Sequence, residues 1–174
     1  ASGLPKMGGG DMALELRLHT SSQEETEALG VSIGEAIHDP VVIAMYGEMG
    51  SGKTAFVRGL AVGLGVRGVV NSPTYTLMKR YEGRLTLDHY DAWMEGRERD
   101  ILADGAHELL GLDGVSVIEW ADRVEDWLPK ERLEVRLLVT GASERGVTLR
   151  WLSINDEAPG ALSSLGVWDV PDAA

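Results

Sequence analysis

The chain of 174 residues contains no cysteine, which excludes disulfide bonds, thiolate zinc sites and cysteine nucleophiles. It also lacks any apolar run close to the ~20 residues that a membrane-spanning helix needs. Positive charge is scarce, because 16 lysines and arginines stand against 28 aspartates and glutamates, a formal net charge of -12. Binding to a phosphate backbone depends on Lys and Arg displacing counterions, so direct binding of nucleic acid is disfavoured. We expect a cytoplasmic protein that reaches any RNA through other proteins.

The remaining composition is that of one globular domain, since 44% of the residues are apolar and can form a sizeable core. Residues 1–12 begin without methionine and include a run of glycines, so we expect a flexible lead or a remnant of an expression vector. Residues 156–174 mix proline, glycine and serine with a few apolar residues and are expected to form a C-terminal tail. The expected domain spans residues 13–155.

A complete phosphate-loop motif, G-x-x-x-x-G-K-[ST], occupies Gly47–Thr54. It follows the apolar run Val41–Tyr46 and opens a stretch with helical spacing, which is the strand-loop-helix setting the motif requires. Glycines allow successive N–H groups to face a phosphate, and the helix adds its positive N-terminal end. Lys53 is expected to reach the β and γ phosphates, and Thr54 to ligate Mg²⁺. The motif predicts a nucleoside triphosphate site; a glycine-rich turn that matches by accident is the alternative.

Two motifs of Ras-like GTPases, N-K-x-D and D-x-x-G, are missing, so ATP is the predicted nucleotide. An arginine-rich lid of the kind found in metabolite kinases is not evident either, and Arg97 and Arg99 are the nearest candidates. Large aromatic side chains are more often core residues than ligand platforms. We therefore expect Trp93, Trp127 and Trp151 to be buried.

Hydrophobic periodicity predicts the order of elements along the chain. A capping-box form at Ser22–Glu25 begins a helix that ends before Asp39-Pro40, and a weaker helix, interrupted by Gly105, is expected between Glu98 and Leu110. The expected strands are Leu14–Leu18, Val41–Tyr46, Met78–Glu82, Leu85–Tyr90, Val115–Glu119, Leu133–Val139 and Val147–Trp151. Early helical crossovers and late hairpins predict an α/β fold, a P-loop NTPase-like three-layer sandwich with a mixed central sheet. The nucleotide should lie at the carboxyl end of the 41–46 strand.

Hydrolysis at a phosphate loop also requires a carboxylate on the metal side and a group that orients water. Glu119 ends an apolar strand, as the second motif of nucleotide-binding proteins does, and could hold Mg²⁺; a glutamate that merely ends a strand is the alternative. His89 and Asp91 alternate onto one face of their strand. Asp91 could orient the attacking water or accept its proton. A structural or metal-binding His-x-Asp pair is the alternative.

A cluster of hydroxyls surrounds Pro73, where switch segments of phosphate-loop proteins sense the γ-phosphate. The candidate switch residues are Ser72, Thr74 and Thr76. Thr74 or Thr76 could close onto Mg²⁺ or the γ-phosphate. A turn that leads into a strand is the alternative.

In this order and at these spacings, the motifs resemble those of the bacterial TsaE (YjeE) family, over roughly Leu14 to Trp151. The motifs are Tyr46–Thr54, Phe56-Val-Arg-Gly-Leu60, Ser72-Pro-Thr-Tyr-Thr-Leu77, His89-Tyr-Asp91 and Ile118-Glu-Trp120. The phosphate loop is shared with many proteins, whereas the last three motifs in succession are specific to this family. The resemblance implies an ATPase that acts with TsaB and TsaD, which transfer a threonylcarbamoyl group to the adenosine next to the anticodon in tRNAs reading codons that begin with A. It also implies that the transfer chemistry belongs to TsaD and that ATP hydrolysis supports repeated turnover.

The resemblance also assigns roles to individual residues. The phosphate contacts are Met49, Gly50, Ser51, Gly52, Lys53 and Thr54. Thr54 and Glu119 are implied metal ligands, and Asp91, with Lys53, is implied in hydrolysis. Trp120 is placed near the nucleotide, and Gln23 and Arg145 where the family makes further ATP contacts. The sequence departs from the family at Trp93 and Met94, where Tyr-Arg is usual, and at Ala121, where proline is common.

Two other functions fit the phosphate loop. One is a phosphotransferase that acts on a small metabolite, with Asp91 as the base and Arg97 or Arg99 over the phosphoryl group. The other is a binding module that senses ATP without hydrolysing it. For the ATPase, we predict slow hydrolysis in isolation, because no arginine finger is evident in the sequence.

Overall fold

The computed structural model describes residues 12–71, 73, 78–93, 96, 99–100 and 105–153. Within these ranges seven strands form one sheet in the order β1-β7-β6-β2-β5-β4-β3. The strands are β1 (Met12–Thr20), β2 (Val41–Tyr46), β3 (Met78–Tyr81), β4 (Leu87–Asp91), β5 (Val115–Glu119), β6 (Arg132–Val139) and β7 (Arg145–Ser153). The helices are α1 (Gln23–Ala36), α2 (Lys53–Gly63), α4 (Ala106–Leu109) and the 3-10 helices η1 (Ala121–Arg123) and η2 (Glu125–Trp127). The predicted mixed α/β sheet is confirmed.

The centre of the sheet is parallel and its two sides are antiparallel. β2 lies between β5 and β6 and is parallel to both, and β4 is parallel to β5. The β6–β7–β1 meander and the β3–β4 hairpin complete the sheet with antiparallel pairs. Val42 to Tyr46 are all buried. This burial agrees with the continuous apolar run, which is typical of a strand covered on both faces. This arrangement places the end of β2, where the phosphate loop starts, in the middle of the sheet.

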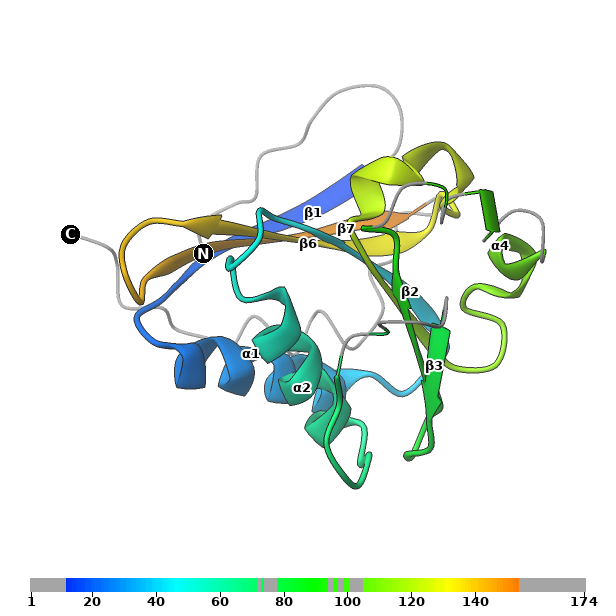
Figure 1. The fold of residues 1–174 in the computed structure, drawn as a ribbon, viewed down its shortest axis with the longest axis horizontal. Coiled ribbons are helices and arrows are strands. Elements are labelled where there is room, and N and C mark those ends of the chain that lie inside the picture. The colour runs from blue at the N-terminus through cyan, green and yellow to red at the C-terminus, as the bar shows by residue number, and fades with distance from the viewer. Residues whose placement is uncertain are drawn as a thin grey trace.

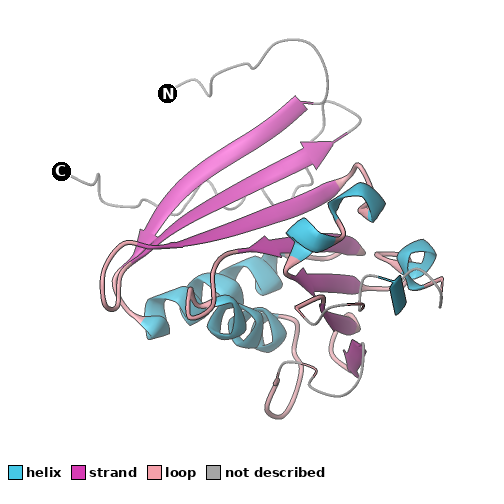
Figure 2. Ribbon diagram, turned by 45° about the horizontal axis from the view of Figure 1, so that its top comes forward, coloured by secondary structure: helices cyan, strands magenta, loops and turns pink. Residues whose placement is uncertain are grey.

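Helices cover the two faces of the sheet unequally. α1 and α2 lie side by side on one face (Figures 1 and 2), where Ile33 and Phe56 pack with Met45 in the larger core cluster. On the other face a smaller cluster joins Tyr90 to Val124, which lies between η1 and η2. The predicted three layers are present, and the second helical layer is made of short segments.

Glycines bring α1 and α2 into backbone contact. Gly30 and Gly34 of α1 face Gly59 and Gly63 of α2, and the two helices run parallel. A Cβ atom added at Gly59 would collide with the carbonyl oxygen of Glu27, and one at Gly30 with the carbonyl oxygen of Phe56. The N-terminal ends of both helices are therefore held side by side, next to the phosphate loop.

Polar contacts fix both ends of α1. Ser22 Oγ accepts from the backbone N–H of Glu25 at 3.1 Å, as the predicted cap requires. The Glu25 carboxylate accepts from the N–H of Ser21 at 2.6 Å, one residue earlier than in the usual capping box. At the other end the Arg84 guanidinium donates to the carbonyls of Ile37 and Gly34 at 2.8 and 2.9 Å. The β3–β4 turn is thereby attached to the helical layer.

Several expectations differ from the structure. The helix expected between Glu98 and Leu110 is broken, because Gly105 has a φ of +66° and α4 begins only after it. Trp93 and Trp127 are 41% and 49% exposed, so the expectation that they are core residues was wrong, whereas Trp151 is buried as expected. Met12 already belongs to β1. The rest of the expected lead, and the tail 156–174, lie outside the described residues. Within the described ranges, every helix is too short or too polar to cross a membrane.

Candidate functional site

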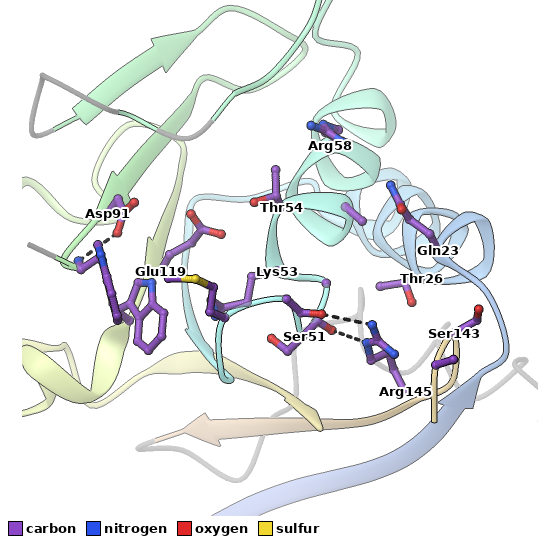
Figure 3. A pocket seen from close by; sticks show the side chains of 17 residues that line it. Gln23, Thr26, Ser51, Lys53, Thr54, Arg58, Asp91, Glu119, Ser143 and Arg145 are labelled. Atoms are coloured by element: carbon purple, nitrogen blue, oxygen red, sulfur yellow. Dashed lines mark hydrogen bonds between the residues drawn. The ribbon is translucent and has the colours of Figure 1, made fainter. Parts of the chain in front are cut away.

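A pocket of about 470 Å³ opens at the carboxyl end of β2, between the phosphate loop, the ends of β4 and β5, the start of α1 and the β6–β7 turn (Figure 3). The nucleotide was predicted at this end of β2, so the pocket lies at the predicted place. The predicted site residues that line it are Gln23, Met49, Gly50, Ser51, Gly52, Lys53, Thr54, Asp91, Glu119, Trp120 and Arg145. The predicted switch residues Ser72, Thr74 and Thr76 lie outside the described residues.

The phosphate loop has the backbone conformation that its glycines were expected to supply. Gly47, Gly50 and Gly52 have φ values of +154°, +78° and +103°. A Cβ atom at Gly47 would lie 2.8 Å from the carbonyl oxygen of Leu137, so this position also needs glycine for space. The Ser51 hydroxyl is buried and has no hydrogen-bond partner in the part of the chain that the structure describes. An unpaired hydroxyl in the loop fits a ligand with acceptor oxygens, such as a phosphate.

Lys53 is the first residue of α2 and is only 6% exposed. Its ammonium donates to the carbonyl of Gly47 and, at 2.9 Å, to that of Glu48. It also lies 4.1 Å from the centre of the Trp120 ring. Burial lowers the pKa of Lys53, and the carboxylates of Glu119 and Asp91 oppose that shift. The charge is thus held inside the loop, at the place where the motif predicts a phosphate.

Two carboxylates and one hydroxyl face the same end of the pocket. Asp91 and Glu119 are paired residues at the ends of the parallel strands β4 and β5, and Thr54 points toward them from the first turn of α2 (Figure 3). Among the described residues no three His, Cys, Asp or Glu side chains are grouped to hold a metal by themselves. One hydroxyl and one or two carboxylates suit Mg²⁺, which takes its remaining ligands from nucleotide phosphates and water. The donor set therefore fits a nucleotide-bound Mg²⁺.

His89 lies beneath these carboxylates. Its side chain is fully buried, and its Nε2 is 3.1 Å from Glu119 Oε2. The sequence placed His89 on the face of Asp91 but did not identify Glu119 as its partner, because the two are on different strands. The Asp91 carboxylate accepts from the N–H of Trp93 at 2.9 Å.

Trp120 has an unusual backbone for a bulky residue. Its φ of +58° is the only positive value at a non-glycine residue in the described ranges, a conformation that costs about 1–3 kcal/mol. This turn places the Trp120 ring beside Lys53 and in contact with Trp93, with 4.3 Å between the two ring centroids. Arg123 lies 5.5 Å from the centre of the Trp93 ring. The two rings form one wall of the pocket.

Arg145 enters from the β6–β7 hairpin and binds the phosphate loop itself. Its Nε donates to the Ser51 carbonyl at 3.0 Å, and its Nη2 to the Gly50 carbonyl at 3.1 Å. Its Nη1 donates to the carbonyls of Gly141 and Glu144. The position predicted for a further ATP contact is therefore occupied by a residue that braces the loop. An additional contact of Arg145 with ATP stays a prediction, as does the one expected for Gln23.

Sequence reasoning missed several lining residues, which are Thr26, Ala55, Arg58, Trp93, Ala142 and Ser143. Arg58 follows Thr54 by one helical turn, and this spacing could have identified it. Arg99 is not among the lining residues, and Arg97 lies outside the described ones. Among the described lining residues, Lys53, Arg58 and Arg145 give three cations against two carboxylates, in a chain with a net charge of -12. This local excess of positive charge suits a polyphosphate.

Comparison with known proteins gives matches over most of the chain. Residues 20–147 match the family model described as threonylcarbamoyl adenosine biosynthesis protein TsaE. A TsaE protein of Treponema pallidum is 37% identical, over 77% of this chain and 99% of its own length. One of Bacillus subtilis is 38% identical, over 77% of this chain and 84% of its own length. The crystal structure of Bacillus subtilis YdiB matches with a TM-score of 0.68 and 33% identity, covering 82% of this chain and 88% of that one.

Proposed function

Because this chain belongs to the TsaE family of tRNA threonylcarbamoyladenosine biosynthesis proteins, we propose that it is a Mg²⁺-dependent ATPase that supports this modification together with TsaB and TsaD. The observation that carries the proposal is one pocket in which the phosphate loop faces Asp91 and Glu119. The resemblance adds the proposed substrate, the adenosine next to the anticodon in tRNAs reading codons that begin with A.

In the proposed complex, backbone N–H groups of residues 49–54 and the N-terminal end of α2 hold the phosphates of ATP. Lys53 exchanges its bonds to the Gly47 and Glu48 carbonyls for phosphate oxygens. Thr54 and Glu119 would hold Mg²⁺, which when bound neutralises charge on the phosphates. Asp91, kept in place by the N–H of Trp93, orients the water that attacks the γ-phosphate.

Slow hydrolysis by the isolated chain follows from how its cations are engaged. Arg145 is bound to four backbone carbonyls, and Arg58 Nε donates to the Val70 carbonyl at 3.4 Å. These contacts use part of the N–H groups of each guanidinium, so neither is a fully unengaged arginine finger for the transition state. We therefore propose that the partner proteins promote turnover. The acidic composition supports docking on these cytoplasmic partners in preference to tRNA.

The test is ATP hydrolysis with Mg²⁺, measured for the protein alone and then with TsaB, TsaD and tRNA. Lys53→Ala and Glu119→Ala should abolish the activity, and Glu131→Ala, an exposed carboxylate outside the pocket, should not change it. Activity that rises with the partners and vanishes in both pocket variants supports the proposal. Turnover that the partners leave unchanged would contradict the coupling.

The phosphotransferase alternative has lost part of its basis, because Arg99 does not line the pocket. It would be favoured only if the γ-phosphate appeared on an organic acceptor instead of in water. The ATP-sensing alternative would be favoured if Asp91→Ala changed partner binding and left phosphate release unaltered.

A further inference from the structure

We propose that His89 is a positioning residue that fixes the Glu119 carboxylate for its metal, a role that presupposes the Mg²⁺–ATP site proposed above. His89 is fully buried, and its Nε2 lies 3.1 Å from Glu119 Oε2. His89 is not among the residues that line the pocket, so it does not contact a bound ligand directly. It acts on the site through Glu119.

The surroundings of His89 argue against a mere space-filling role. It follows the buried Leu87 on the same face of β4, and its paired residue on β5 is the buried Val117. Both neighbours belong to the larger hydrophobic core, where a leucine would fill the volume without burying polar nitrogens. The Nδ1 atom is buried without a hydrogen-bond partner in the described part of the chain. The bond to Glu119 is therefore the polar contact that explains an imidazole at this depth.

The direction of this hydrogen bond follows from its chemistry. A carboxylate that ligates a metal is ionised and only accepts hydrogen bonds. His89 Nε2 must therefore carry a proton and donate the hydrogen bond to Glu119. A ring with its only proton on Nδ1 would instead turn a lone pair toward Glu119. A donor on the core side restricts the rotation of the Glu119 carboxylate, which lines the pocket. Such partners of metal ligands typically change metal affinity by about 10- to 100-fold when removed.

The experiment separates metal binding from nucleotide binding. Mn²⁺ affinity in the presence of ADP is measured by EPR, and ADP affinity without metal is measured in EDTA. His89→Leu should weaken Mn²⁺ about 10-fold or more, with metal-free ADP affinity unchanged. His89→Gln, which keeps an N–H donor, should recover most of the loss. Leu87→Val, a core change next to His89 on the same face, should leave Mn²⁺ affinity unaltered.

A double-mutant cycle tests whether His89 acts through Glu119. In a Glu119→Gln background, His89→Leu should no longer weaken Mn²⁺, because the carboxylate that it orients is gone. Equal Mn²⁺ affinity in His89→Leu and wild type would overturn the inference, as would an equal loss of metal-free ADP binding. Failure of the wild-type protein to bind ADP at all would instead contradict the proposed function.

The unsubstituted protein offers a measurement that does not depend on the folding of a variant. In a ¹⁵N spectrum of labelled histidine, the His89 signals, identified by their loss in His89→Gln, should show a protonated Nε2. An Nε2 without a proton would place a lone pair against the Glu119 carboxylate and would overturn the inference.

Discussion

Lys53 buries most of its surface together with a full charge, so this residue, the proposed phosphate contact, is also a source of instability. Its pKa is lowered by burial, so the folded protein holds the proton less tightly than the unfolded chain does. Between the folded pKa and the unfolded value of 10.5, the unfolded chain binds more protons, and the stability contributed by this group rises with pH. Below that window the full penalty for burying the ammonium is present.

We therefore expect Lys53→Met to abolish ATP binding and to change the pH dependence of stability. At neutral pH the variant lacks the free-energy cost of burying the Lys53 ammonium. This advantage over the wild type should shrink as the pH rises toward 10.5, because the wild-type lysine then loses its charge. Urea unfolding of both proteins between pH 7 and pH 10 measures the difference. A difference in the free energy of unfolding that stays constant across this range would contradict the assigned burial of the charge.

Arg145 could support ATP binding through its hydrogen bonds to the phosphate loop or through its charge alone, and a substitution can distinguish the two. Arg145→Lys keeps the charge but cannot form the forked bonds to Ser51 and Gly50, so it should weaken ATP binding almost as much as Arg145→Ala does. With about 1 kcal/mol for each lost bond, the loss should be about tenfold or more in ATP affinity, measured by calorimetry. Arg17→Ala, at a highly exposed arginine on β1, is the control. Full retention of affinity in Arg145→Lys would show that charge alone is sufficient.

At the scale of elements, the α1–α2 pair decides where the phosphate loop lies. α2 begins at Lys53 and α1 contributes Gln23 and Thr26 to the same pocket. Because glycines let the two backbones touch, the spacing between the helices is set by main-chain atoms and not by side chains that can adopt other rotamers. The pocket therefore has a fixed width on this side.

Gly59→Ala should reverse the usual effect of this substitution. In an open helix, alanine is more stable than glycine by about 0.5–1 kcal/mol. At Gly59 the new methyl group would collide with the Glu27 carbonyl, so we expect a loss of about 1–3 kcal/mol and weaker ATP binding. Urea unfolding and calorimetry measure the two effects, with Val62→Ala on the exposed side of α2 as the control. A stabilised Gly59→Ala protein would show that the helices can separate without consequence.

At the scale of the whole molecule, the net charge argues against direct binding of tRNA. The isolated protein, with its net charge of -12, should not bind tRNA with micromolar affinity at physiological salt. Fluorescence anisotropy of labelled tRNA, with and without TsaB and TsaD, checks this expectation. Micromolar binding by the protein alone would remove the electrostatic reason for docking on partner proteins.

The parts of this fold that depend on local pattern could be predicted from the sequence, and those that depend on distant contacts could not. Alternation and the phosphate-loop motif located the strands and the pocket floor, since each depends on neighbouring residues. The bonds of Arg145 to residues more than 90 positions earlier left no local signal. Trp93 was expected in the core because a large aromatic usually is, yet β4 ends at Asp91 and the ring packs on Trp120 at the pocket wall. The pairing of His89 with Glu119 required knowledge that β4 and β5 are neighbours.

The contact between Arg145 and the phosphate loop also bears on how the protein is made. A ribosome completes Gly47–Thr54 long before it reaches Arg145, and β1, the first strand that the structure describes, pairs with β7, the last one described. A growing chain would thus carry the whole nucleotide motif without the brace that holds it and without the partner of its first strand. We expect ATP to bind only to chains in which β6, β7 and Arg145 are already in place. A chain that stops before β6 should neither retain ATP nor be protected by ATP from proteolysis.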